Sequence, residues 1–95
     1  MQTLLDVHTH TIVSGHAFCT LNEMIAEAQK HELTLFGVTE HGPAIPGTCT
    51  DIYFRNLHVV PRQYGNMRLL LGAELNIIDY EGNVDITNPN TLDNR

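Results

Sequence analysis

The sequence predicts an α/β fold built on parallel strands, and three observations support this prediction. Between residues 3 and 38, a short apolar strand pattern, a helical pattern and a second apolar run follow one another. This order is typical of a βαβ unit, whose two strands are parallel and whose crossover is right-handed. A further apolar run at residues 67–73 supplies a third strand. Histidines or carboxylates follow all three runs, as at the carboxyl ends of parallel strands.

The helix of this unit is predicted from its first turn and from the spacing of its apolar residues. Thr20 and Glu23 stand at the start of the pattern with the spacing of a capping box. We therefore expect the helix to begin after Thr20 and to end near His31 or Glu32. Its apolar residues recur at helical intervals and are Leu21, Met24, Ile25 and Ala28.

The strands and loops around this helix follow from short apolar runs and from glycine and proline. Strands are expected at residues 3–8, 33–38 and 67–73, and the run at 33–38 has the pattern of a strand buried on both faces. Loops are expected at residues 9–19 and 42–47, where periodicity is lost.

The second half of the chain is less regular. Residues 51–64 are ambiguous, and we interpret them as a short helix or an irregular crossover interrupted by Pro61. A small hairpin is predicted from residues 75–79 and 84–86. Three parallel strands with one clear helix leave two sheet edges and one uncovered face. We therefore expect residues 1–95 to be a single domain that forms the N-terminal part of a larger α/β barrel, truncated before the barrel closes.

Composition and charge exclude several classes of protein. The chain has 95 residues, of which 42% are hydrophobic, as in an ordinary globular domain. Its formal charge is -6 and it has no basic cluster, so a nucleic-acid partner is not expected. Cys19 and Cys49 lack the density of a disulfide scaffold, and residues 1–6 lack the features of a signal peptide. The two cysteines therefore favour a reduced, cytoplasmic setting. No apolar run is long enough to cross a membrane, so no membrane partner is expected.

Five residues at the ends of the predicted strands form a candidate metal site. Carboxyl ends of parallel strands converge on one face of an α/β barrel, so polar residues at these ends meet in space. Two of the histidines alternate along an extended segment and therefore share a face. Neutral imidazoles in this arrangement suit zinc or a similar metal. The five residues are His8, His10, His16, His41 and Glu74.

Other polar residues near the strand ends have more than one interpretation. Asp6 can bind metal or orient an imidazole, and Glu40 can act as a helix cap, an ion-pair partner or an acceptor outside the metal shell. Cys49 is interpreted as a loop or core residue rather than a zinc ligand. His31, at the end of the predicted helix, and His58 are interpreted as surface or hydrogen-bonded residues.

Four motifs resemble those of one protein family. They are Asp6-Val7-His8-Thr9-His10, Gly15-His16, Val38-Thr39-Glu40-His41-Gly42-Pro43 and Gly72-Ala73-Glu74-Leu75-Asn76. Together they closely resemble the opening motifs of PHP-domain (polymerase and histidinol phosphatase) proteins. Residues 74–85 make the resemblance strongest to the small bacterial PHP phosphatases similar to YcdX. The resemblance implies a distorted (β/α)7 TIM-like barrel that holds two or three divalent ions, often Zn²⁺, with Mn²⁺ or Fe as alternatives.

The resemblance also implies roles for the five residues. His8 and His10 would bind one metal, Glu74 would bridge it to a second, and His16 and His41 would bind a third. The family completes these shells with two further histidines and an Asp-x-His pair, which the 95 residues do not contain.

The activity that the resemblance implies is hydrolysis of a phosphate monoester in a small phosphorylated substrate, through a metal-activated water. We expect this activity of the parent protein. The alternatives are an amidohydrolase-type metal hydrolase and a non-catalytic metal- or partner-binding fragment. The sequence assigns no catalytic residue beyond the ligands and no oligomeric state.

Overall fold

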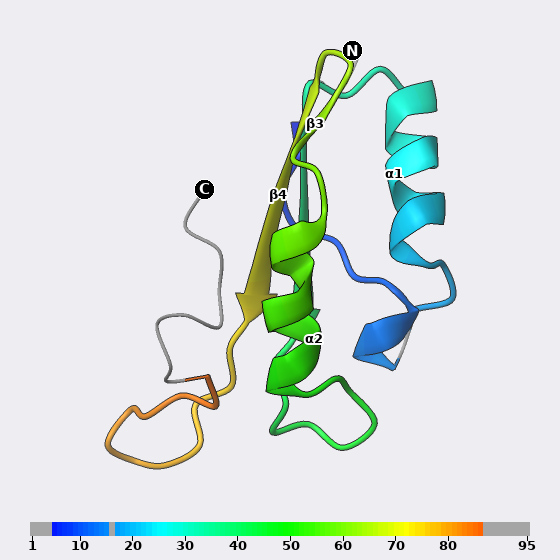
Figure 1. The fold of residues 1–95 in the computed structure, drawn as a ribbon. Helices are drawn as coiled ribbons and strands as arrows, with labels where there is room; N and C mark the ends of the chain where they lie inside the picture. Colours follow the sequence, from blue (N-terminus) through cyan, green and yellow to red (C-terminus); the bar gives the residue numbers. More distant parts are fainter. Residues whose placement is uncertain (1–4, 16, 87–95) are drawn as a thin grey trace.

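The described part of the protein forms one sheet of four strands in the order β1-β2-β4-β3, and Figure 1 draws the strands as arrows. This computed structural model describes residues 5–15 and 17–86. β1 (Leu5–Asp6), β2 (Leu35–His41) and β4 (Met67–Glu74) run parallel, and β3 (Gln63–Tyr64) pairs antiparallel with β4. The predicted α/β class with a mainly parallel sheet is confirmed at this level. The part of the first predicted strand at residues 3–4 lies outside the described residues.

β2 and β4 form the centre of the sheet, and their carboxyl ends lie side by side. Their register runs from Leu35 opposite Arg68 to His41 opposite Glu74. β2 therefore continues beyond residue 38, where the sequence predicted its end. The apolar run stops there, but the backbone of the polar residues that follow still pairs with β4. As a result, two residues of the predicted metal site face each other across neighbouring strands.

Helix α1 (Leu21–Lys30) begins at the predicted capping box. The Glu23 N–H donates to Thr20 Oγ1 at 3.2 Å, and the Thr20 N–H donates to Glu23 Oε1 at 3.0 Å. The hydrogen bond from the Thr20 backbone, and then the one with its side chain, lowers the pKa of the exposed Glu23 carboxyl. Ile25 and Ala28 are buried in the core, so the predicted apolar face of this helix is confirmed.

The ambiguous residues 51–64 form two short helices and the edge strand. Helix α2 (Asp51–Asn56) is followed by the 3-10 helix η2 (Leu57–Val59) and then by β3. The guanidinium of Arg62 donates to the carbonyl oxygens of Leu57, at 2.9 Å, and of Val60, which satisfies acceptors at the end of these helices. β3 was not predicted, because a strand of two residues shows no periodicity.

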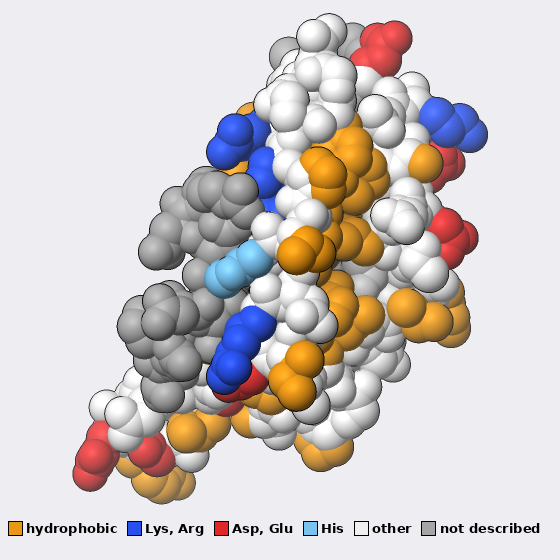
Figure 2. Space-filling view, viewed as in Figure 1, with side chains coloured by type: hydrophobic (Ala, Val, Ile, Leu, Met, Phe, Trp, Pro, Cys, Tyr) orange, Lys and Arg blue, Asp and Glu red, His pale blue; other side chains and the backbone are white. Residues whose placement is uncertain are grey.

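The two faces of the sheet differ in burial. On one face the side chains of β2 and β4 join those of both described α-helices in one core, whose buried members include Phe36, Val38, Leu69, Leu71, Ile25 and Phe54. The opposite face, which carries Thr39, His41, Leu70 and Glu74, is only partly buried. Within the predicted run at residues 33–38, Gly37 on this face is buried and Leu35 is partly buried, so the prediction of a strand buried on both faces is confirmed only in part. On the helix side, hydrophobic side chains gather in a strip between α1 and α2 (Figure 2).

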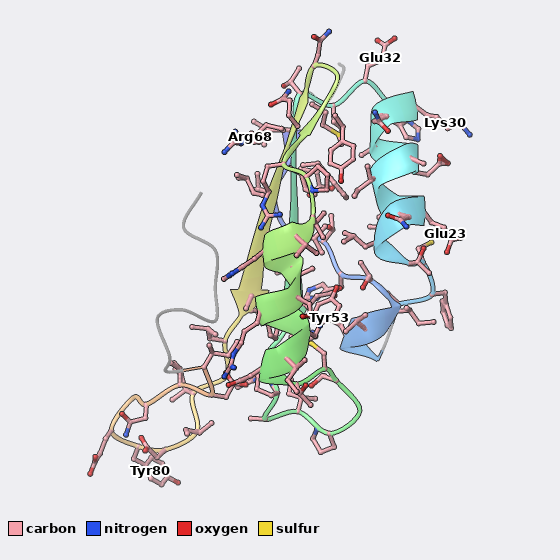
Figure 3. The ribbon with its side chains drawn as sticks, in the orientation of Figure 1. Glu23, Lys30, Glu32, Tyr53, Arg68 and Tyr80 are labelled. Carbon is pink, nitrogen blue, oxygen red and sulfur yellow. The ribbon has the colours of Figure 1, made fainter. Side chains whose placement is uncertain are left out.

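The predicted hairpin at residues 75–86 is present as one antiparallel bridge between Ile77 and Val84. The carboxylate of Asp79 organises the turn by accepting from the Asn83 side chain at 2.7 Å and from the Glu81 N–H at 2.9 Å. These bonds, led by the one from the Asn83 side chain, hold the pKa of Asp79 below its usual value. Tyr80 lies at the tip and points away from the rest of the protein (Figure 3).

Candidate metal site

The segment that carries His8 and His10 runs against β2, although it is extended chain rather than regular strand. Thr9 Oγ1 donates to the Gly37 carbonyl oxygen at 2.8 Å. Gly37 permits this close approach, because a Cβ at that position would lie 2.9 Å from the Cα of Val7. Any larger residue at position 37 would force the histidine segment away from the sheet.

The carboxylate of Glu74 brings three imidazole rings together at the strand ends. Glu74 Oε1 lies 3.2 Å from His8 Nε2 and 3.6 Å from His10 Nε2, and Glu74 Oε2 lies 2.7 Å from His41 Nδ1. The His10 and His41 rings stack with centroids 4.4 Å apart, and the His8 ring meets the His10 ring edge-on at 4.9 Å. Four of the five predicted site residues therefore lie in one cluster, which we call the Glu74 cluster.

The Glu74 cluster has donor atoms suited to a metal ion. One ligand atom from each of His8, His10 and Glu74 lies within 4.8 Å of the other two. Imidazole nitrogen and carboxylate oxygen are ligands of Zn²⁺ and of related divalent metals. The cluster is also open on one side, since the side chains of Glu74 and His8 are 41% and 62% exposed. This exposure leaves room for a further ligand.

Glu40, next to His41 in the chain, points to the opposite face of β2 and is fully buried. Its carboxylate accepts from the Thr11 N–H at 2.8 Å, the Thr11 hydroxyl, the Ser14 hydroxyl at 2.7 Å and the Tyr53 hydroxyl at 3.2 Å. Figure 3 shows Tyr53 on α2 beside the segment around residues 12–14. Burial, and then the charge of Glu40, raises the pKa of Tyr53. Of the three roles that the sequence left open for Glu40, the geometry favours an acceptor outside the metal cluster.

Two other residues that the sequence considered as ligands lie outside the cluster. Asp6 Oδ1 accepts from the His8 N–H at 3.3 Å, so its carboxylate contacts the backbone of the histidine segment. The Cys49 thiol donates to the His41 carbonyl oxygen at 3.8 Å. Burial raises the pKa of Cys49 to about 11, which favours the neutral thiol over the thiolate that binds metal. The interpretation of Cys49 as a loop or core residue agrees with this.

Two further histidines, His31 and His58, lie on helical elements away from the strand ends. His31 is the C-cap of α1 and His58 lies in η2, and both are exposed. Figure 3 labels Lys30 and Glu32 on either side of His31, at the end of the molecule opposite the carboxyl end of β4. His16 lies outside the described residues, so its predicted role as a ligand stays a prediction.

A hydrogen-bond network that was not predicted joins the loop after β2 to the segment after β4. Asp85 Oδ2 accepts from the Asn76 side chain at 2.6 Å and from the Ala44 N–H at 3.0 Å, and Asp85 Oδ1 accepts from the Asn76 N–H at 3.0 Å. Burial opposes ionisation of Asp85, but the bonds from Ala44 and Asn76 together outweigh it and lower the pKa. Gly42 makes room for this carboxylate, since a Cβ there would lie 2.3 Å from Asp85 Oδ2. Asn76 and Asp85 fall in the stretch that resembles the PHP family, but isolated polar residues in a loop carry no signal of their own.

A pocket of about 380 Å³ opens beside the Glu74 cluster. Its lining residues are Ser14, Gly15, His41, Ile45, Pro46 and Gly47. The loop after β2 forms one wall, and His41 connects the pocket to the cluster. A small molecule bound in this pocket would therefore contact the metal-ligand candidates.

Fold and site together define an α/β domain with a candidate metal centre at the carboxyl ends of its parallel strands. Residues 6–94 match the PHP domain family, and the chain belongs to that family. The resemblance inferred from the four motifs is thereby confirmed. Within residues 5–15 and 17–86, no helix is long and apolar enough to cross a membrane.

Several curated bacterial proteins that are named probable phosphatases are similar to this chain. The protein of Caldicellulosiruptor saccharolyticus is 51% identical over 82 residues, which make up 86% of this chain and 34% of the relative. A relative from Clostridium botulinum is 49% identical over 86 residues, covering 90% of this chain and 35% of the relative. A relative from Acetivibrio thermocellus is 45% identical over the same length, with 36% of the relative covered. The chain thus spans about a third of the length of these relatives.

Proposed function

We propose that this chain supplies ligands to the metal site of a phosphoesterase that hydrolyses a phosphate monoester. The observation that carries the proposal is the convergence of His8, His10 and His41 on both oxygens of Glu74. The printed names of the relatives, probable phosphatases, supply the reaction class. The proposed ligands are His8, His10, His16, His41 and Glu74, and Zn²⁺ is the proposed metal, with Mn²⁺ or Fe as substitutes.

Glu74 is the residue on which this proposal depends most. Its two oxygens face different imidazoles, Oε1 toward His8 and His10 and Oε2 toward His41. Glu74 and the three histidines would hold the metal. Divalent cations bound there would supply positive charge for phosphate oxygens and a nucleophile derived from water.

The rest of the chain would shape the site around the substrate. The pocket beside His41 is of a size suited to a small phosphorylated molecule. Gly15 lets its walls approach closely, because a Cβ there would lie 2.8 Å from the Gly47 carbonyl oxygen. The chain's net charge of -6 disfavours phosphate, so the positive charge of bound cations is needed to attract such a substrate.

We further propose that residues 1–95 are the opening part of one PHP domain with a distorted (β/α)7 barrel. The half-exposed face of β2 and β4, which carries Thr39, His41 and Glu74, would then line the barrel interior. The coverage of only about a third of each relative supports this proposal.

Metal content and phosphatase activity test the proposed function together. The full-length parent protein, purified without chelators, should contain zinc, manganese or iron above background, and it should hydrolyse p-nitrophenyl phosphate when Zn²⁺ or Mn²⁺ is added. His10→Ala and Glu74→Gln should lower both metal content and activity. His31→Ala, an exposed histidine at the far end of α1, is the matched control and should change neither.

Three results would overturn the proposal. Absence of bound metal in the wild-type parent protein would exclude the metal site. Turnover of amides or lactams but not of phosphate esters would assign the site to an amidohydrolase-type reaction. Metal binding without any turnover by the parent protein would leave a metal-binding module in place of the enzyme.

A further inference from the structure

The hydroxyl of Ser14 contacts three groups that connect the two faces of β2. Ser14 Oγ donates to Glu40 Oε1 at 2.7 Å and accepts from the His41 N–H at 2.9 Å. It also lies 3.2 Å from His10 Nδ1. Ser14 is itself 5% exposed, so water has little access to these contacts.

Counting hydrogens and lone pairs assigns the tautomer of His10. A serine hydroxyl has one hydrogen to donate and two lone pairs to accept with. The hydrogen of Ser14 goes to Glu40, and one lone pair is taken by the His41 N–H. The lone pair that remains faces His10 Nδ1, so this nitrogen carries the proton. Nε2 of the neutral ring then carries the lone pair of the ring, and Nε2 is the nitrogen that faces Glu74.

We propose that Glu40 is a positioning residue that acts through Ser14 to hold His10 as the Nδ1–H tautomer, with Nε2 presented to the metal site. This proposal rests on the proposed function for its consequence, metal binding, but not for the tautomer itself. Histidines that bind metal through one nitrogen are commonly oriented by a hydrogen bond at the other. Here the acceptor is a hydroxyl whose own hydrogen is directed by a buried carboxylate.

Glu40 is suited to this role because its orientation is determined from two other elements. The Thr11 N–H and hydroxyl bind it from the start of η1 (Ile12–Ser14), and the Tyr53 hydroxyl binds it from α2. With both oxygens occupied, the carboxylate has no alternative rotamer that keeps its partners. The hydroxyl hydrogen of Ser14 therefore has one preferred acceptor, and the lone pair toward His10 stays available.

The tautomer can be measured in wild-type protein without metal. Long-range ¹⁵N–¹H correlation spectra of the full chain at about pH 8, where imidazoles are mostly neutral, distinguish Nδ1–H from Nε2–H rings. We expect His10 to be the Nδ1–H tautomer. A predominantly Nε2–H ring would overturn the proposal, and this test does not depend on any variant folding.

Variants of Ser14 test the mechanism. Ser14→Ala should let His10 populate the Nε2–H tautomer and should lower Zn²⁺ affinity by roughly 10–100-fold, measured by competition with a chelating dye. Ser14→Thr keeps the hydroxyl and should retain most of the Nδ1–H signal. Thr48→Ala removes a hydroxyl that donates to Gly42 and Ile45 in the neighbouring loop, and as a matched control it should leave the His10 spectrum unchanged.

The outcomes separate this proposal from the proposed function. An unchanged His10 tautomer in Ser14→Ala would overturn the positioning role even if the wild-type protein binds Zn²⁺. Conversely, a wild-type protein that shows the Nδ1–H tautomer but binds no Zn²⁺ would support the hydrogen-bond assignment and overturn the metal site.

Discussion

Glu40 and Glu74 stand at the ends of neighbouring strands and have opposite surroundings. Glu40 is fully buried and receives hydrogen bonds from Thr11, Ser14 and Tyr53. Glu74 has a side chain that is 41% exposed and faces ring nitrogens of three histidines. The first carboxylate is satisfied by donors of its own chain. The carboxylate of Glu74 is surrounded by imidazoles, which can bind a cation when they are neutral, as the carboxylate can.

This difference indicates which carboxylate stabilises the fold and which is free to bind. A buried carboxylate with several donors is costly to remove, because its partners lose their acceptor in a place without water. A half-exposed carboxylate among imidazoles contributes less to folding and more to ligand affinity. Substitutions at the two carboxylates should therefore separate the stability of the fold from the affinity for metal.

Glu40→Ala should destabilise the fold by roughly 3–5 kcal/mol, because it leaves buried donors of Thr11, Ser14 and Tyr53 without their acceptor. Urea unfolding monitored by circular dichroism measures this loss. Glu40→Gln, which keeps the shape and part of the acceptor capacity, should cost less. Equal stability of Glu40→Ala and wild type would show that the buried network contributes nothing to the fold.

Glu74→Gln should lower Zn²⁺ affinity by at least about tenfold while changing the free energy of unfolding of the metal-free protein by less than about 1 kcal/mol. Titration with Zn²⁺ and thermal unfolding measure the two quantities. Removing metal with a chelator should lower the Tm of wild type but not that of the variant. Glu81→Gln, an exposed carboxylate in the turn after β4, is the control. A large loss of stability in metal-free Glu74→Gln would contradict the contrast.

Gly42→Ala should destabilise the protein by about 1–3 kcal/mol, because the new Cβ would lie 2.3 Å from Asp85 Oδ2 and would displace that carboxylate from Ala44 and Asn76. The loss is measured by urea unfolding. Gly82→Ala, where φ is positive but no atom lies within 4 Å, separates this steric effect from the conformational effect of removing a glycine. Relief of the loss in the double variant with Asp85→Ala would identify the clash as its cause.

Tyr53→Phe should cost about 1 kcal/mol, since it removes one of several donors to Glu40 and leaves the ring in place. The same change should leave the affinity for Zn²⁺ within about twofold of wild type, because Tyr53 contacts the carboxylate and not a histidine. A fall in affinity as large as that of Glu74→Gln would show that the Tyr53 hydroxyl is itself needed to hold Glu40 in the orientation that acts through Ser14 on His10.

The smallest effect is expected in the acid range and concerns Asp85. Because its pKa is lower in the folded protein than in the unfolded chain, its ionised form adds stability above the unfolded pKa of about 4. This stability is lost as the pH falls through the folded pKa. Asp85→Asn should therefore show a shallower loss of stability between about pH 5 and pH 2 than wild type. If both proteins lose stability equally between about pH 5 and pH 2, the lowered pKa of Asp85 would be contradicted.

The sequence predicted those parts of the fold that depend on local pattern. The capping box at Thr20, the apolar face of α1 and the strand at β4 follow from spacing within a few residues. β3 and the exact end of β2 could not be predicted, because pairing with β4 determines them and not their own composition. The lower burial of Thr39 and His41 on the second face of β2 depends in the same way on which elements cover the sheet.

For the candidate site, the sequence predicted which residues lie together but not the hydrogen bonds that orient them. The H-x-H segment, His41 and Glu74 were recognised because parallel strand ends converge, and four of the five residues lie together. The importance of Ser14 and Thr11 could not be predicted, because a hydroxyl in a loop has no distinguishing pattern until its partner Glu40 is placed. Metal binding itself stays a prediction.

The alternation of side chains along β2 gives the neighbours Glu40 and His41 opposite destinations, one in the core and one in the cluster. A deletion of one residue before Glu40 would place the imidazole of His41 among the hydroxyl donors, whereas an insertion of one residue would place the carboxylate of Glu40 opposite Glu74. A point substitution can alter either the hydrogen bonds of Glu40 or the Glu74 cluster alone. A one-residue shift in the register of this strand would disrupt both at once. The number of residues in β2 is therefore under a stricter constraint than the identity of any one residue in the strand.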